Sequence, residues 1–213
     1  MEVLDILRKL GAIITDDHFV YTSGKHGSIY VRKDMLYPHT NEVAKVGKLF
    51  AEKFKNSLID VVVGPAVGGI ILSQWAAYYL TQLTNKDVLS VFTEKVSDPN
   101  QLFNKNQEFK RGFDQLVKGK NVLIVEDLTT TGGSVKRVVD AVKKAKGNIV
   151  SICVMVNRDP DLVNSKSIGA EFTQLGILKA EAFDEVDCTY CKEKRPINTT
   201  VGHGKEYLEN KKY

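Results

Sequence analysis

The fold of this chain is decided by the stretch Val122-Leu-Ile-Val-Glu126-Asp127-Leu-Thr-Thr130-Thr131-Gly132-Gly133-Ser134. An apolar strand over 121–125 ends in two adjacent carboxylates, and a turn of threonines, glycines and a serine follows. The apolar periodicity from Val135 onward predicts a helix. The stretch therefore predicts a strand, a polar turn and a helix in immediate succession.

The residue types in this turn suit a sugar phosphate. Backbone N–H groups at the start of a helix form an anion site, and glycines let the backbone approach a phosphate closely. Glu126 and Asp127 accept hydrogen bonds when ionised, which suits the vicinal hydroxyls of a ribose or a hydrated divalent metal. The alternative is an acidic turn in which Ser and Thr side chains only cap the helix.

Elsewhere in the chain, short apolar runs alternate with helical patterns. This alternation predicts an α/β fold, with a parallel sheet flanked by helices and ligands gathered beyond the carboxyl ends of the strands. Strands are expected at 60–63, 88–93, 122–125 and 149–156, and helices at 2–10, 41–55, 69–83 and 135–146. Residues 13–21 and 28–33 predict two further strands.

These patterns divide the chain into three parts. They are an N-terminal helix and hairpin (1–40), an α/β core (41–156) with a long loop at 94–120, and a C-terminal segment (157–213). The hairpin and the C-terminal segment are expected to form a small hood over the sheet. A loop as long as 94–120 is typical of a lid.

Composition limits the class of protein. The 213 residues carry a net charge of +4, which does not argue for nucleic acid as a partner. No apolar run reaches the roughly 20 residues of a membrane helix, and the charged N-terminus is not expected to be a signal peptide. Three cysteines suit a reducing cytoplasm.

The segment 122–134 resembles the thirteen-residue phosphoribosyl-pyrophosphate (PRPP) signature of the type I phosphoribosyltransferases. It matches neither Gly-x-x-x-x-Gly-Lys-Ser/Thr nor Gly-x-Gly-x-x-Gly. The resemblance implies a Rossmann-like core, Mg²⁺ as cofactor and a homodimer. It implies that Glu126 and Asp127 hold the ribose hydroxyls. The 5′-phosphate would lie against Thr129, Thr130, Thr131, Gly132, Gly133 and Ser134.

A second glycine-rich turn lies at Val63-Gly-Pro-Ala66-Val67-Gly68-Gly69-Ile70. By resemblance, Ala66, Val67, Gly68 and Gly69 would bind the pyrophosphate half of PRPP. The alternative is a tight turn in which glycine is needed for packing.

Within the family, the chain is most similar to orotate phosphoribosyltransferases. The hairpin Ser23-Gly-Lys25-His-Gly-Ser-Ile-Tyr30 resembles the entry to their substrate hood, and Arg158 follows a strand where they carry Asp-Arg, with Asn157 here in place of the aspartate. The resemblance places Lys25, Tyr30, Arg158 and Thr130 at the base. It implies transfer of phosphoribosyl from PRPP to orotate, giving orotidine 5′-monophosphate and pyrophosphate in pyrimidine biosynthesis.

The long loop departs from that pattern. Orotate enzymes carry Arg-Lys-x-x-Lys-x-His-Gly here, whereas this chain has Thr93-Glu-Lys95-Val-Ser-Asp-Pro and, later, Lys110-Arg111-Gly112. Lys95, Lys110 and Arg111, with Asp127, are therefore the candidate catalytic residues. The departure leaves two alternatives open: a purine or xanthine phosphoribosyltransferase, and a non-catalytic PRPP-sensing regulator.

The C-terminal segment carries Cys188-Thr-Tyr-Cys191. Cys-x-x-Cys is half of a common zinc site, and His203 is a candidate third ligand beside Cys188 and Cys191. The alternative is a reduced structural turn without metal. His18 and His39 are expected in turns or on the surface.

Overall fold

The computed structural model describes residues 2–21, 23–97 and 105–211, and its centre is a mixed six-stranded sheet of order β10-β9-β8-β5-β6-β7. Five strands run parallel, and β7 pairs antiparallel with β6 at the edge. The strands are β5 (Val61–Pro65), β6 (Leu89–Ser97), β7 (Lys105–Phe109), β8 (Asn121–Thr129), β9 (Asn148–Asn157) and β10 (Phe172–Ile177). The predicted α/β fold class is confirmed.

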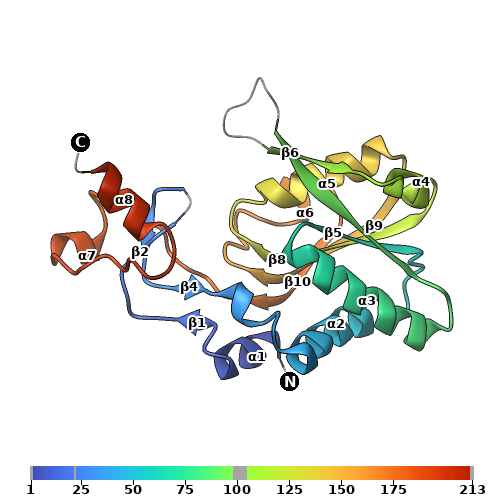
Figure 1. Ribbon diagram of the computed structural model, residues 1–213, viewed down its shortest axis with the longest axis horizontal. Coiled ribbons are helices and arrows are strands. Elements are labelled where there is room, and N and C mark those ends of the chain that lie inside the picture. The colour runs from blue at the N-terminus through green and yellow to red at the C-terminus, as the bar shows by residue number, and fades with distance from the viewer. Residues whose placement is uncertain (1, 22, 98–104, 212–213) are drawn as a thin grey trace.

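Helices cover both faces of the sheet (Figure 1). One apolar core includes residues of α1 (Val3–Lys9), α2 (Thr40–Phe54) and α3 (Gly68–Thr84). The other includes residues of α4 (Phe113–Val117), α5 (Gly133–Lys144) and α6 (Ser165–Ile168). The strands between them are apolar on both faces, as parallel strands covered on both sides require.

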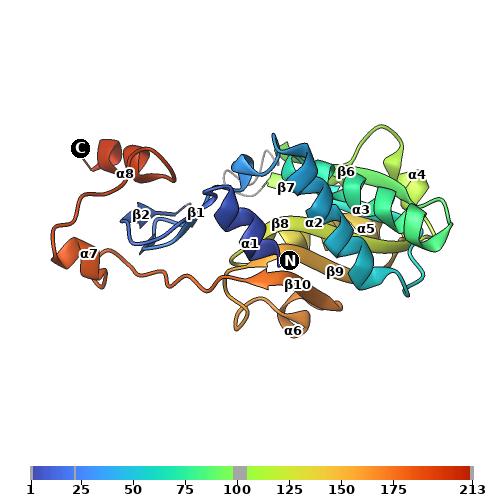
Figure 2. The same ribbon diagram turned by 90° about the horizontal axis from the view of Figure 1, so that it is seen from below.

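The hood consists of residues 15–31 and 183–211, and it lies at one end of the molecule, beside the sheet (Figures 1 and 2). In the hood, β2 (Phe19–Val20) pairs with β3 (His26–Gly27), while β1 (Ile13–Ile14) pairs with β4 (Tyr30–Val31) at its base. A single turn of 3-10 helix, η1 (Lys33–Met35), leads from β4 to α2.

The C-terminal part of the hood carries α7 (Thr189–Lys192) and α8 (Gly204–Asn210). It joins the hairpin through the backbone: Phe183 and His26 bridge as antiparallel partners, and the His203 N–H donates to the Val20 carbonyl at 2.9 Å. The two ends of the chain therefore form the hood together.

Two segments are more regular than the sequence predicted. Residues 94–120 contain the end of β6, then β7 and α4, with 98–104 outside the described residues. The C-terminal segment supplies β10 to the sheet. Both β7 and β10 are edge strands, and an edge strand has a neighbouring strand on one side only, so its sequence pattern is weaker. The division of the chain into three parts stays a prediction.

Among the described residues, no helix combines the length and the apolar character that crossing a membrane requires.

Candidate active site

The acid pair lies near the carboxyl end of β8, where both side chains are almost completely buried. Glu126 Oε1 accepts a hydrogen bond from the Asp127 N–H at 3.0 Å, and Oε2 accepts one from the Ser134 hydroxyl at 2.9 Å. Burial and the neighbouring Asp127 charge raise the pKa of Glu126 to about 8.

Asp127 faces a cation and a phenol. The Lys33 ammonium lies 2.9 Å from its carboxylate, and the Tyr37 hydroxyl donates to Oδ2 at 2.8 Å. Burial opposes the charged form of Lys33, but the Asp127 charge and hydrogen bond outweigh it, so the pKa of Lys33 is raised. Burial, then Asp127, raises the pKa of Tyr37. Asp127 thus has a cation and a hydrogen-bond donor as its direct neighbours.

No local sequence pattern indicates Lys33 or Tyr37 as site residues. Both lie between the start of η1 and the start of α2. They precede Asp127 by 94 and 90 residues. Between them, Leu36 is fully buried in the apolar core that includes α1, α2 and α3, and this anchors the segment beside Asp127. A motif search along the chain cannot detect such a pair.

The second glycine-rich turn faces the acid pair. Gly64 touches Gly69, since a Cβ on Gly64 would lie 2.1 Å from the Gly69 carbonyl oxygen. A Cβ on Gly68 would lie 2.2 Å from Asp127 Oδ2. The peptide bond between Ala66 and Val67 is cis. Glycine at these positions is what lets the turn approach the carboxylate.

A cavity of about 210 Å³ separates the two turns. Its lining combines backbone of the glycine-rich turn with cations and carboxylates. The lining residues are Lys33, Asp34, Tyr37, Pro65, Ala66, Val67, Gly68, Lys95, Gln107, Glu126, Asp127, Leu128 and Ser134.

The hydroxyl and glycine turn joins β8 to α5. The Gly132 N–H donates to Thr129 Oγ1 at 3.2 Å, and Gly132 takes a φ of 74°, in the left-handed region that favours glycine. Thr129 is buried, Thr130 half-buried and Thr131 exposed. From Gly133 the chain enters the 12-residue helix α5, whose first N–H groups lack partners within the helix. This geometry offers an anion site next to the acid pair.

The sequence matches the model of the phosphoribosyl transferase domain over residues 32–171. It is 39% identical to the orotate phosphoribosyltransferase of Thermoanaerobacter sp. (strain X514), covering 92% of this chain and 94% of that one. This chain belongs to the phosphoribosyltransferase family.

Two further comparisons agree with that assignment. The orotate phosphoribosyltransferase of Thermotoga maritima is 35% identical, covering 95% of this chain and 98% of the relative. The crystal structure of the orotate phosphoribosyltransferase from Aeropyrum pernix is similar in fold, with a TM-score of 0.62 at 22% identity, covering 83% of this chain and 93% of that chain. The predicted membership of the family, and with it the predicted class of enzyme, is confirmed.

In this phosphoribosyltransferase the three predicted lid cations are not equivalent. Lys95 lines the cavity, opposite Gln107 in the β6–β7 pair. Lys110 and Arg111 instead lie 3.9 and 3.2 Å from Glu94, and neither lines the cavity. Gln107 was not predicted, although it is 5% exposed and its Oε1 has no hydrogen-bond partner among the described residues.

The predicted base-binding residues lie apart from the cavity lining. Arg158 is buried, with its guanidinium 4.4 Å from the centre of the Tyr21 ring and Nη2 donating to the Ile29 carbonyl at 3.4 Å. Tyr30 packs against Phe19, with 5.4 Å between ring centres. Exposed Lys25 pairs with Asp184 at 3.6 Å. Thr130 is also outside the cavity lining. The structure thus brings Arg158 under the hairpin but leaves Lys25 on the hood surface.

The structure corrects the histidine predictions. His203 is not beside the two cysteines, because its ring lies at the start of α8, with Nδ1 3.2 Å from Glu206. His18 and His26 occupy that place, and His18, expected in a turn or on the surface, is only 1% exposed. His39 precedes α2 and is exposed. Two histidines from the hairpin therefore meet the cysteines of the C-terminal segment.

Proposed function

We propose that this phosphoribosyltransferase transfers the phosphoribosyl group of PRPP to orotate, giving orotidine 5′-monophosphate and pyrophosphate in pyrimidine nucleotide biosynthesis. The relatives that match over more than 90% of the chain carry the name orotate phosphoribosyltransferase. The observation that carries the proposal is the buried acid pair facing the glycine-rich turn across one cavity, with Lys33 and Lys95 on its walls.

Different groups around the cavity would bind the ribose, the 5′-phosphate and the pyrophosphate of PRPP. Glu126 and Asp127 would accept hydrogen bonds from the ribose hydroxyls. The N–H groups of 132–134 and the hydroxyls of Thr129, Thr130, Thr131 and Ser134 would hold the 5′-phosphate, aided by the α5 dipole. Ala66, Val67, Gly68 and Gly69 would take the pyrophosphate, because the first three line the cavity and glycine lets this turn lie close to Asp127.

Catalysis would depend on positioning and charge stabilisation. As pyrophosphate leaves, the anomeric carbon develops positive charge, and no protein nucleophile is required. Lys95 lies where it could meet the departing pyrophosphate, and Gln107 could donate an amide hydrogen bond beside it. Lys33 would pass from Asp127 to a PRPP oxygen as the ribose engages the carboxylate. Lys110 and Arg111 would contribute only after leaving Glu94.

Orotate would be recognised at the hood. A guanidinium binds a carboxylate through two parallel hydrogen bonds, and Arg158 Nε lacks a partner among the described residues. Tyr30 and Lys25 would border the base from the hairpin, and Thr130 from the phosphate turn.

Mg²⁺ fits this cavity. Its oxygen donors are the carboxylates of Glu126, Asp127 and Asp34, and Mg²⁺ takes oxygen ligands, often from one or two carboxylates plus substrate phosphates. When bound, the ion would neutralise charge on the leaving pyrophosphate. The rest of the proposal is a cytoplasmic homodimer that binds neither nucleic acid nor membrane; the three cysteines are free, as in a reducing compartment.

The test is pyrophosphate release from PRPP and Mg²⁺, with orotate, uracil, adenine, guanine, hypoxanthine and xanthine supplied one at a time. We expect release with orotate alone. Release with a purine would support the PRPP site but show that the base is a purine and not orotate. The absence of the usual orotate-enzyme motif after β6 favours this second candidate, a purine or xanthine phosphoribosyltransferase. If none of the six bases gave pyrophosphate release but PRPP still bound, the protein would be a non-catalytic PRPP-sensing regulator.

A further inference from the structure

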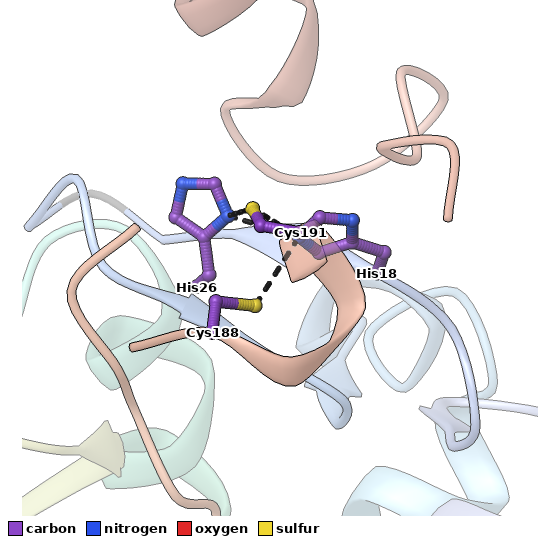
Figure 3. A group of neighbouring side chains, drawn as sticks. All are labelled: His18, His26, Cys188 and Cys191. Carbon is purple, nitrogen blue, oxygen red and sulfur yellow. Dashed lines mark hydrogen bonds between the residues drawn. The ribbon is translucent and has the colours of Figure 1, made fainter. Parts of the chain in front are cut away.

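Four metal-binding side chains meet in the hood, away from the cavity. They come from opposite ends of the chain: His18 precedes β2, His26 lies in β3, Cys188 caps α7 and Cys191 lies within α7 (Figure 3). One ligand atom from each, two nitrogens and two sulfurs, lies within 4.8 Å of all the others. His18, His26 and Cys188 are fully or almost fully buried.

The distances match a tetrahedral centre. Zn–S bonds of about 2.3 Å and Zn–N bonds of about 2.0–2.1 Å place tetrahedral ligand atoms roughly 3.3–3.8 Å apart. Both Sγ atoms lie 3.6 Å from His18 Nε2, and Cys191 Sγ lies 3.3 Å from His26 Nδ1. The two ring nitrogens are 2.9 Å apart and would separate by a few tenths of an ångström.

The tautomer of His18 is set from outside the group. Its Nδ1 lies 2.9 Å from the Arg195 carbonyl oxygen, which can only accept, so Nδ1 carries the proton. In a neutral imidazole, Nε2 then presents its lone pair to the two sulfurs and to His26. A backbone carbonyl that orients a histidine in this way is the usual outer partner of a metal ligand.

Apart from Val31 at its base, the described part of the hood lies outside both apolar cores of the sheet. Neither apolar core includes a residue of the hairpin from 15 to 30 or of the segment 183–211. Its described strands have two residues each, and its helices four and seven. A unit this small usually depends on a metal, a disulfide or a larger partner, and the cysteines are free.

We propose that His18, His26, Cys188 and Cys191 bind a structural Zn²⁺ that joins the N-terminal hairpin to the C-terminal segment. Two thiolates and two imidazoles with no open position are typical of structural zinc. Binding releases the two thiol protons to solvent, and the two thiolates balance the charge of the ion. The proposal is independent of which base the enzyme uses.

The test is the zinc content of the purified full-length chain, by inductively coupled plasma mass spectrometry. We expect roughly one zinc per chain in the wild type and its loss in Cys188→Ser and in His18→Ala. His203→Ala is the matched control, because this nearby histidine lies outside the group, and it should keep the zinc. His26→Cys should also keep it, since a thiolate can replace the imidazole.

A second measurement covers variants that fail to fold. Cobalt(II) added to metal-free wild-type protein should give the visible bands of a tetrahedral site with thiolate ligands, and added Zn²⁺ should remove them. Zinc-free wild-type protein that gives no such bands, or a Cys188–Cys191 disulfide found in the freshly purified chain, would overturn the proposal. So would loss of zinc in His203→Ala with retention in His18→Ala.

Discussion

Two adjacent carboxylates occupy different electrostatic environments in the candidate active site. Glu126 receives two hydrogen bonds and no ion pair from the described residues, and burial raises its pKa. Asp127 is as deeply buried but lies against Lys33. The two acids therefore differ in their partners, and replacing each by its amide should have unequal effects.

Replacing Asp127 with Asn should lower kcat/KM for PRPP at least about tenfold, which is about 1.4 kcal/mol of transition-state stabilisation. The variant removes the charge that faces Lys33 and leaves the side-chain shape. Steady-state pyrophosphate release measures the effect. Asp140→Asn is the control, since Asp140 is exposed on α5 and does not line the cavity. Equal kinetics for wild type and Asp127→Asn would refute the assigned role.

Glu126 should also make stability depend on pH. Its pKa is about 8 in the folded protein and 4.5 for an ordinary glutamate, so between these the folded state holds a proton that the unfolded state has released. Stability therefore falls as pH rises through this window. We expect the free energy of unfolding, measured with urea, to fall more between pH 5.0 and pH 8.5 for the wild type than for Glu126→Gln. The two decreases should differ by more than about 1 kcal/mol, roughly the free energy of one pKa unit. Parallel losses would contradict the assignment.

Replacing Arg158 with Ala should raise the KM for orotate far more than the KM for PRPP. The guanidinium lies under the hairpin, outside the PRPP cavity, so only the base should lose a partner. Initial-rate kinetics with each substrate varied gives both constants. Arg158→Lys keeps the charge but not the two-pronged donor, and it should recover only part of the orotate affinity. Equal increases in both constants would exclude a role in reading the base.

At the scale of elements, the pair β6–β7 determines which cations reach the cavity. Lys95 and Gln107 are register partners on this pair and both line the cavity, whereas Lys110 and Arg111 follow β7 and are held by Glu94. Sequence spacing alone could not separate these three cations, because β7 carries no strand pattern.

Lys95→Ala should therefore lower kcat at least about tenfold, because a cation beside the departing pyrophosphate stabilises charge in the transition state. Lys110→Ala is the matched control and should stay within about threefold, since exposed ion pairs contribute little. Single-turnover pyrophosphate release separates this step from product release. A larger loss in Lys110→Ala would mean that the hairpin rearranges during turnover.

The sequence predicted those elements whose patterns are local. β5, α3, β8 and α5 were found because apolar strands run directly into glycine-rich turns and amphipathic helices. β7 and β10 were missed, since edge strands are identified by their neighbours in space. Lys33, Tyr37 and His18 were missed for the same reason: each makes its key contact with a residue far along the chain. Local motifs thus predicted the phosphate turns, whereas the partners supplied by tertiary packing needed the structure.

At the scale of the whole molecule, stability comes from two sources. The sheet and its helices hold both apolar cores, to which Val31 is the one described hood residue that belongs. The hood depends on backbone pairing between the hairpin and the C-terminal segment and on the four side chains around His18. The predicted base-binding residues Lys25 and Tyr30 belong to the hood, and the PRPP cavity belongs to the sheet and η1. Loss of the proposed zinc should therefore destabilise the hood and leave the sheet with its PRPP cavity intact.

Hydrogen exchange tests this separation. After removal of zinc by a chelator, amides of 15–31 and 183–211 should exchange at least about tenfold faster, because opening of the hood would cost less free energy. Amides of β5, β8 and β9 should keep their wild-type rates, since those strands lie between two intact cores. PRPP binding should survive while the KM for orotate rises. Faster exchange across the whole sheet would instead mean that hood and core unfold as one unit, and unchanged exchange in the hood would mean that backbone pairing alone holds the chain ends together.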